Sequence, residues 1–264
     1  MIISRKHGYI FLHSRKTAGS SISVSLSRDL GPDDLMLSGL LETMEAGMPI
    51  PAHMIRDARA QLRDQPLLQE TRMRAAFFGL RGKAKRHYAI RKLVNRRYSE
   101  ILNEEHPQHA YAETIARAFP EDWAAFPKIC VVRNPWTKMV SDYFWRTRRM
   151  PQRPTFEAFV RAIETGDDLG GYIQLRYSDN WPLYTIDNEI VADHVIRFEN
   201  LMPGLAETFA ALNIPFDGWL PNAKGGHRPN KGKKADPRSF YTPELRDTVG
   251  RLYEREIAAF NYRF

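Results

Sequence analysis

A short polar turn between an apolar run and a helix-forming segment lies near the start of the chain and restricts its fold more than any other feature. The apolar run covers residues 8–13 and predicts a buried strand, and the segment from about 21 to 30 predicts a helix that ends at Gly31-Pro32. The turn between them reads His13-Ser14-Arg15-Lys16-Thr17-Ala18-Gly19-Ser20-Ser21. This order of elements is typical of a protein in which strands and helices alternate.

The same alternation recurs later in the chain. A strand is predicted at 128–132 and a third at 194–198, each followed by a helix, and Asn134 is a good N-cap for the first of these helices. A final helix is predicted from its cap Thr242 through Phe260. We therefore expect an α/β fold with a P-loop-like, mostly parallel sheet flanked by helices. One domain would span residues 1–264, with a helix-rich basic insertion at about 33–105, between the first and second core strands.

The polar turn carries groups that suit an anion. A strand-to-helix turn directs backbone N–H groups and the positive end of a helix toward a ligand, and Lys16 adds a mobile charge. Thr17, Ser20 and Ser21 add hydroxyl donors. This chemistry fits a phosphate or a phosphosulfate, although the serines of an ordinary turn would also cap the helix. The spacing of an ATP-hydrolysing Walker A loop is absent.

A second anion-binding device follows the second predicted strand. Arg133 stands at the strand end, where a guanidinium can bind a phosphate through two hydrogen bonds. Ser141 follows eight residues later, about two helical turns, and can project toward the same side. Two such devices at successive strand ends indicate one ligand with two separated anionic groups.

With these motifs the chain resembles the nucleotide-dependent sulfotransferases, and within them the carbohydrate-type branch. Residues 197–201, which read Arg-Phe-Glu-Asn-Leu, and residues 241–245 at the last helix extend the resemblance to the C-terminal part of the chain. The region before His106 is largely unmatched. The loop departs from the family in carrying Arg15 where proline is usual and Ser20 where threonine is common.

The resemblance implies a co-substrate, 3′-phosphoadenosine-5′-phosphosulfate, and no metal. It implies that Lys16 stabilises the bridging oxygen of the leaving group, that Arg133 and Ser141 bind the extra ribose phosphate, and that a basic C-terminal loop closes over that phosphate. The residues expected to bind the donor are Arg15, Lys16, Thr17, Ala18, Gly19, Ser20, Ser21, Arg133, Ser141, Lys231, Gly232 and Lys233.

A base is needed for the acceptor hydroxyl, and a histidine upstream of the second strand commonly fills this role in the family. His109 fits that place, with His106 as the near alternative, while both could also be solvated histidines ahead of a helix. His13 is expected to be a packed or phosphate-flanking residue. Trp181 is a candidate for stacking on the adenine and equally for the core.

The charge of the chain is concentrated in one segment. The formal net charge is +8, and residues 71–99 contain no acidic side chain. Ile90, Val94, Tyr98 and Ile101 recur in it at helical spacing. An amphipathic helix with a solvated basic face, a groove for an acidic acceptor, a membrane contact and nucleic-acid binding all remain open, although no nucleic-acid-binding motif is present. The segment 221–238 is rich in Gly, Pro, Asn and Lys and predicts a mobile loop.

Compartment and partners follow from the remaining features. The single cysteine, Cys130, favours a reducing compartment, and no stretch approaches the roughly 20 apolar residues of a membrane span, so we expect a soluble cytoplasmic protein. The leading hypothesis is sulfuryl transfer to a hydroxyl of a carbohydrate, with an acidic carbohydrate as one candidate and no specific nucleic acid. The alternatives are a non-catalytic basic protein that binds nucleic acid or membranes, and an ATP-dependent kinase of a small metabolite.

Overall fold

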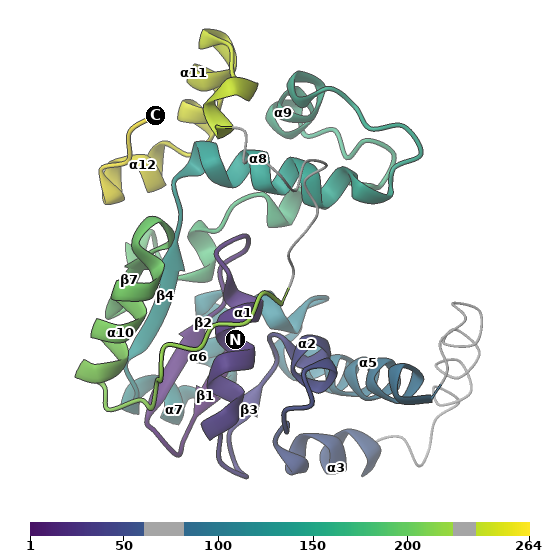
Figure 1. Ribbon diagram of the computed structural model, residues 1–264, viewed down its shortest axis with the longest axis vertical. Helices are drawn as coiled ribbons and strands as arrows, with labels where there is room; N and C mark the ends of the chain where they lie inside the picture. The colour runs from purple at the N-terminus through teal and green to yellow at the C-terminus, as the bar shows by residue number, and fades with distance from the viewer. Residues whose placement is uncertain (61–81, 224–235) are drawn as a thin grey trace.

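A computed structural model of the chain describes residues 1–60, 82–223 and 236–264. It has a layer built on a five-stranded sheet and, next to it, a layer of helices (Figure 1). The strands are β1 (Ile2–Ser4), β2 (Tyr9–Leu12), β3 (Leu35–Met36), β4 (Lys128–Val132) and β7 (His194–Arg197), in the order β3-β1-β2-β4-β7. A separate two-stranded ribbon consists of β5 (Thr185–Ile186) and β6 (Glu189–Ile190).

The sheet is mixed, which corrects the expectation of a mostly parallel one. Strands β2, β4 and β7 are parallel, whereas β1 pairs antiparallel with both β2 and β3. For β1 and β2 the physical reason is the short connection at residues 5–8, since a turn of this length joins only antiparallel strands. Gly8 takes part in this turn with a φ of 66°, a conformation that favours glycine. No strand was predicted at residues 2–4, although all three residues of β1 are buried.

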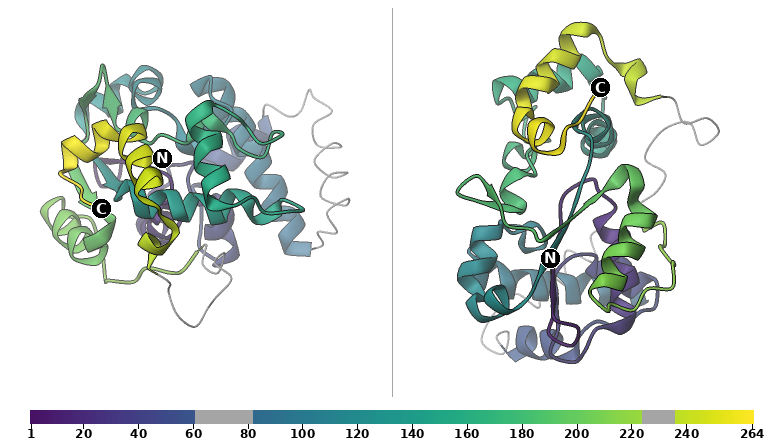
Figure 2. Two further views of the ribbon diagram at one scale, coloured as in Figure 1. Left: turned by 90° about the horizontal axis from the view of Figure 1, so that it is seen from above. Right: turned by 90° about the vertical axis from the view of Figure 1, so that its left-hand side faces the viewer.

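Helices cover both faces of the sheet. α1 (Gly19–Leu26) and α10 (Leu201–Ala211) lie on one face, and α6 (Ala112–Ala118) and α7 (Pro120–Ala125) lie on the other (Figure 2). The second layer contains α8 (Pro135–Arg146), α9 (Phe156–Thr165), α11 (Pro243–Leu252) and α12 (Glu254–Phe260). The chain passes straight from the end of β4 into α8, so the carboxyl end of the sheet meets this layer.

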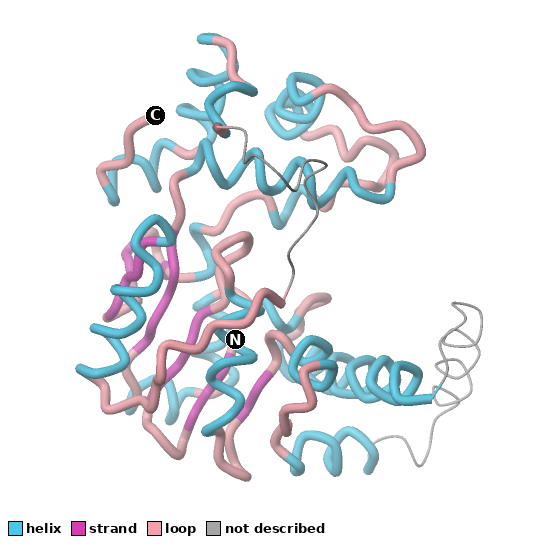
Figure 3. Tube along the Cα trace, in the orientation of Figure 1, coloured by secondary structure: helices cyan, strands magenta, loops and turns pink. Residues whose placement is uncertain are grey.

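The segment between β2 and β4 is rich in helix, as expected, but it also supplies a strand. Figure 3 shows the helices of the part at 33–105 beside one edge of the sheet. Those described are α2 (Leu40–Glu45), α3 (Ala52–Ala60) and α5 (Gly82–Leu102). Leu35–Met36 joins the sheet as β3, so the segment at 33–105 is not wholly helical. In α5 the buried side chains are Ile90, Leu93, Val94, Tyr98 and Leu102, whereas the expected Ile101 is exposed.

The helix caps explain where the site-bearing helices start and stop. The side chain of Asn134 accepts hydrogen bonds from the N–H groups of Trp136 and Thr137, which fixes the start of α8 as expected. Thr242 caps α11 by accepting from the N–H of Leu245. The last helix is not continuous to Phe260, because Tyr253 leaves the helical conformation and separates α11 from α12.

Candidate functional site

A cavity of about 250 Å³ lies where β2 and β4 end. The two strands are parallel neighbours, so the loop after β2 and the start of α8 meet at the same edge of the sheet. The lining residues are His13, Arg15, Lys16, Ala18, Gly19, Ser20, Ser21, His109, Arg133, Ser141, Trp145, Phe198 and Asn222. Three segments far apart in the sequence thus place the candidate residues around one space.

The loop after β2, residues 13–19, has an unusual backbone. Lys16 and Ala18 both have φ of 64°, a left-handed backbone conformation that residues other than glycine rarely adopt. Alternation of this conformation with ordinary ones turns successive N–H groups toward one side and makes an anion-binding concavity. No backbone hydrogen bond from the N–H of Ala18 or of Gly19 is present in the described part of the chain. The loop therefore has the form expected for anion binding.

Two side chains donate hydrogen bonds to carbonyl groups of this loop. Thr17 Oγ1 donates to the carbonyl of Ser14 at 2.9 Å, and Arg133 Nη1 donates to the carbonyl of Lys16 at 2.9 Å. The side chain of Thr17 is fully buried and absent from the cavity lining, so its hydroxyl stabilises the loop instead of reaching the cavity. Among the expected loop residues it alone lies away from the cavity lining.

Gly19 lies beneath an imidazole. A Cβ at this position would be 1.9 Å from Cδ2 of His13, a distance that no side chain permits. His13 is 8% exposed, and its ring packs against Gly19. The glycine is therefore required by the close approach of His13, and not by its own φ.

Arg133 is positioned by three contacts. Its Nε donates to Thr137 Oγ1 at 3.0 Å, its Nη1 bonds the Lys16 carbonyl, and its guanidinium lies 4.1 Å from the ring centroid of Phe198. Such a planar group, held on one edge and stacked on a ring, has a fixed orientation. The strand end at Arg133 thus presents a cation to the same cavity as the loop.

One stripe of α8 faces the cavity. Thr137, Ser141 and Trp145 follow one another at four-residue spacing, which places them on one side of the helix. Thr137 holds Arg133, Ser141 lines the cavity, and the Trp145 ring centroid lies 4.7 Å from the ammonium of Lys16. The guanidinium of Arg148 lies 3.6 Å from the same ring centroid.

A neighbouring stripe of α8 anchors the helix through buried charges. Lys138 and Asp142 are 1% and 2% exposed; the ammonium of Lys138 donates to the carbonyl of Ser178, and Asp142 pairs with Arg146 at 3.2 Å. Burial alone would raise the pKa of Asp142. The cations around it, Arg146 first and then Lys138, Lys16 and Arg15, hold that pKa below its ordinary value.

His109 lies against His13 and lines the cavity. Its Nδ1 is 3.0 Å from the carbonyl oxygen of His13, and the two ring centroids are 4.5 Å apart. A carbonyl oxygen only accepts, so Nδ1 carries the proton, and in a neutral ring Nε2 then holds a lone pair. His106 is absent from the lining; its Nε2 lies 3.0 Å from Gln174 Oε1. The geometry thus brings His109, and not His106, to the cavity.

The charges around the cavity are of one sign. Its lining includes Arg15, Lys16 and Arg133, and no carboxylate side chain is among the described residues that line it. The buried carboxylate of Asp142 interacts electrostatically with Arg15 and Lys16. A cavity of this kind favours a ligand that carries several negative charges.

Sequence reasoning missed several residues that form the site. Trp145, Phe198 and Asn222 line the cavity, and Asn180 bonds the backbone of Arg15. The four-residue spacing of Trp145 from Ser141 could have revealed the first. Asn222 and Asn180 come from loops whose approach depends on tertiary packing, which leaves no local signal. Phe198 belongs to the 197–201 motif and directly follows β7, the parallel neighbour of β4.

Other expectations fall outside the cavity. Trp181 is 7% exposed and packs against Tyr184, as a core residue does. In the described part of the basic segment, Arg96 pairs with Glu100 on α5, and no residue of α5 lines the cavity. Lys231, Gly232, Lys233 and most of the predicted loop at 221–238 lie outside the described residues, as does the first part of the basic segment, up to residue 81.

A metal-binding cluster and a membrane-spanning helix are both absent from the described ranges. No group of three or more His, Cys, Asp and Glu side chains is arranged to hold a metal ion there. In the same ranges, no helix is both long enough and apolar enough to cross a membrane.

Comparison with known proteins adds no relative. A scan of protein-family models, a search of curated proteins and a search of solved structures each found no match to the chain. The function must therefore be argued from the site itself.

Proposed function

We propose that the protein is a sulfotransferase that moves a sulfuryl group from 3′-phosphoadenosine-5′-phosphosulfate to an acceptor hydroxyl. The observation that carries the proposal is the meeting of two anion-binding devices in one cavity. The loop with Lys16 forms one device and Arg133 with Ser141 forms the other. A ligand with anionic groups at two separate positions, as this nucleotide has, would engage both.

The residues present suit such a donor. The loop offers backbone N–H groups and Lys16 to the phosphosulfate end, and Arg133 with Ser141 offers a charged and a neutral donor to the ribose phosphate. When bound, the donor supplies a sulfuryl group whose leaving oxygen gains negative charge during transfer. The absence of carboxylates from the described lining is consistent with a polyanion held without a metal.

Lys16 is proposed to stabilise the charge on the leaving oxygen. Its ammonium is compact and flexible, and it lies at the cavity in contact with the Trp145 ring. A cation–π contact contributes about 0.5–2 kcal/mol, whereas a hydrogen bond to a charged group contributes about 1.5–3 kcal/mol. A hydrogen bond from the ammonium to an anion in the loop is thus of at least comparable strength to its contact with the ring.

His109 is proposed as the general base. Its Nδ1 proton is donated to the His13 carbonyl, so in the neutral ring Nε2 is the nitrogen that would take the proton of the acceptor hydroxyl. In the balanced step the acceptor oxygen forms a bond to sulfur, the bond from sulfur to the bridging oxygen breaks, and the hydroxyl proton moves to Nε2. The products are the sulfated acceptor and adenosine 3′,5′-bisphosphate.

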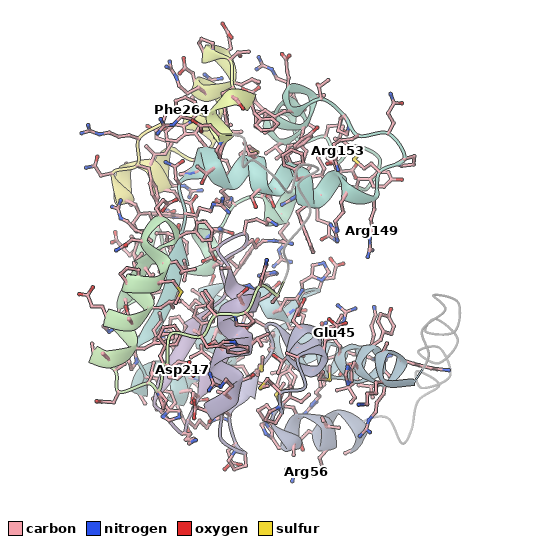
Figure 4. All side chains as sticks on the ribbon, in the orientation of Figure 1. Glu45, Arg56, Arg149, Arg153, Asp217 and Phe264 are labelled. Atoms are coloured by element: carbon pink, nitrogen blue, oxygen red, sulfur yellow. The ribbon has the colours of Figure 1, made fainter. Side chains whose placement is uncertain are left out.

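The acceptor class rests on the family resemblance alone, which favours a carbohydrate hydroxyl. A carbohydrate with carboxylate or sulfate groups would meet cations near the cavity, because Arg148 follows α8 directly and lies on Trp145. Figure 4 shows Arg149, the next residue, extending from this end of the helical layer on the side that faces α2. Burial and the charge of Arg149 lower the pKa of Arg148, as expected for two neighbouring cations.

A ligand comparison tests the proposal. Thermal unfolding is measured with adenosine 3′,5′-bisphosphate, adenosine 5′-monophosphate, ATP and a DNA oligonucleotide, each over a concentration series. The bisphosphate should stabilise most, by about 2.7 kcal/mol at 100 times its dissociation constant. Preference for ATP would favour a kinase, and stabilisation by the oligonucleotide alone would favour a nucleic-acid-binding protein. Transfer of labelled sulfate from the donor to a panel of glycans then tests the reaction.

A further inference from the structure

The side chain of Asn180 forms a pair of hydrogen bonds with the backbone of Arg15, 165 residues away in the sequence. Oδ1 accepts from the Arg15 N–H at 3.0 Å, and Nδ2 donates to the Arg15 carbonyl at 3.0 Å. Asn180 is 2% exposed and does not line the cavity. We propose that Asn180 is a positioning residue that holds the loop of residues 13–19 in its anion-binding conformation. Only the identity of the anion rests on the proposed function.

The support behind Asn180 is rigid. Asn180 directly precedes the short 3-10 helix Trp181–Leu183, whose Leu183 N–H donates to the Asn180 carbonyl at 2.9 Å. Two residues earlier, the carbonyl of Ser178 accepts from Lys138 Nζ at 2.7 Å and from the hydroxyl of Tyr253 at 3.0 Å. The carboxamide is therefore carried by a segment fixed to α8 and to the junction of α11 and α12.

The contact acts on the peptide planes next to Lys16. A peptide plane has its carbonyl and the following N–H on opposite sides, so holding one fixes the other. Asn180 holds the Arg15 carbonyl, between the Ser14 carbonyl that Thr17 holds and the Lys16 carbonyl that Arg133 holds. Three successive carbonyls of the loop are thus each bonded by a side chain. Of the three side chains, Asn180 alone also holds an N–H of the loop.

This restraint is needed because the loop is strained. Left-handed conformations are locally unfavourable for Lys16 and Ala18. They persist only where contacts with the rest of the structure hold the backbone in place. A carboxamide suits the task since it carries one donor side and one acceptor side, and only one orientation satisfies both Arg15 bonds. Aspartate would keep the acceptor and lose the donor, and leucine would fill similar space with neither.

The first experiment measures the affinity for adenosine 3′,5′-bisphosphate by calorimetry together with the melting temperature. Asn180→Leu should weaken binding about tenfold or more, since the loop must be ordered at the expense of binding energy. Asn180→Asp should have an intermediate effect. The matched control is Thr185→Val, which removes a buried hydrogen bond of 2.7 Å to the Trp181 carbonyl in the same supporting segment.

The comparison separates positioning from general stability. Thr185→Val should lower the melting temperature while leaving the dissociation constant within about twofold. If Asn180→Leu lowers the melting temperature as Thr185→Val does and binds the bisphosphate like the wild type, Asn180 is only a structural residue and the inference is wrong.

A second measurement uses the wild-type protein and so survives any folding failure of the variants. Hydrogen exchange of the Arg15 amide should be slow in the ligand-free protein, with protection comparable to amides of β2, because its N–H is bonded to a buried acceptor. Fast exchange of that amide would overturn the inference. If the wild type binds no bisphosphate but protects Arg15, the proposed function fails and the positioning role of Asn180 stands.

Discussion

The imidazole of His13 occupies the space that a side chain at residue 19 would need, with His13 Cδ2 only 1.9 Å from the place of a Gly19 Cβ. His13 ends the strand side of the loop, and Gly19 begins α1, so their contact sets how closely the helix start approaches the strand. The spacing of the two residues is thus part of the geometry of the cavity.

Gly19→Ala should displace either the ring of His13 or the start of α1, which costs about 1–3 kcal/mol as overpacking. Calorimetry should find weaker binding of adenosine 3′,5′-bisphosphate, and His13→Ala in the same chain should restore part of the stability. Gly250→Ala in α11 is the control, because its nearest neighbour would be an ordinary 3.8 Å away, at Trp136. Equal behaviour of the two alanine variants would contradict the steric argument.

Lys16→Ala should abolish sulfuryl transfer and leave the fold intact, because the ammonium acts mainly on the leaving group. Trp145→Leu should lower kcat more moderately, since it removes the ring that keeps Lys16 at the cavity, and Trp145→Phe should recover part of the loss. Turnover assays and thermal unfolding are measured on the same preparations. Normal turnover in folded Lys16→Ala protein would exclude the mechanism.

Arg133→Ala should weaken binding of the bisphosphate more than Ser141→Ala does, because a charge-assisted hydrogen bond contributes more than a neutral one. The arginine also bonds the Lys16 carbonyl, so part of its loss comes through the loop. Titration with adenosine 5′-monophosphate isolates the role of the second phosphate. Equal affinity of the wild type for the two nucleotides would remove the assignment of Arg133 and Ser141.

His109→Ala should lower kcat by a factor on the order of 10² to 10⁴ with little change in donor affinity, as for loss of a general base. His106→Ala should be mild, because His106 lies outside the cavity lining and is bonded to Gln174. Both variants are assayed at saturating donor. The reverse ranking would transfer the role to His106, and two mild effects would place the base elsewhere.

Asp142→Asn should destabilise the protein at neutral pH by up to about 3–5 kcal/mol, the cost of breaking a buried ion pair. The folded pKa of Asp142 lies below its ordinary value of 3.8, so the carboxylate stabilises the fold above that pH. Its contribution is lost as the pH falls through the folded pKa. Unfolding measured from pH 7 to pH 2 should therefore show the wild type and the variant converging in acid. A constant difference across this range would contradict the assignment.

Much of the fold was predictable because its signals are local. The apolar runs at 128–132 and 194–198, the Asn134 cap and the Thr242 cap each depend on a few adjacent residues, and the structure places β4, β7, α8 and α11 accordingly. The antiparallel pairing of β1 was not predicted, because a three-residue strand has too short a pattern to detect. The break at Tyr253 was missed for a related reason, since the apolar spacing of the last helix continues across it.

The candidate site also contains some residues that the sequence predicted and others that it did not. Lys16, Arg133 and Ser141 belong to motifs whose residues are close in sequence, so their arrangement around one cavity follows from two parallel strand ends. Asn180 reaches the loop through tertiary packing alone, whereas Phe198 contacts Arg133 because it directly follows β7, the parallel neighbour of β4. The sequence also assigned the Thr17 hydroxyl to the ligand, but a buried hydroxyl next to a bent backbone satisfies a carbonyl first.

The hydrogen bond from Arg133 to the Lys16 carbonyl joins residues 117 apart. A ribosome adds roughly 5–20 residues per second, so Lys16 leaves it on the order of ten seconds before its partner. During that interval β2 has its hairpin neighbour β1 but not β4, and its four core side chains border an unpaired strand edge. The newly made N-terminal part of this chain should therefore be prone to association until the second half arrives.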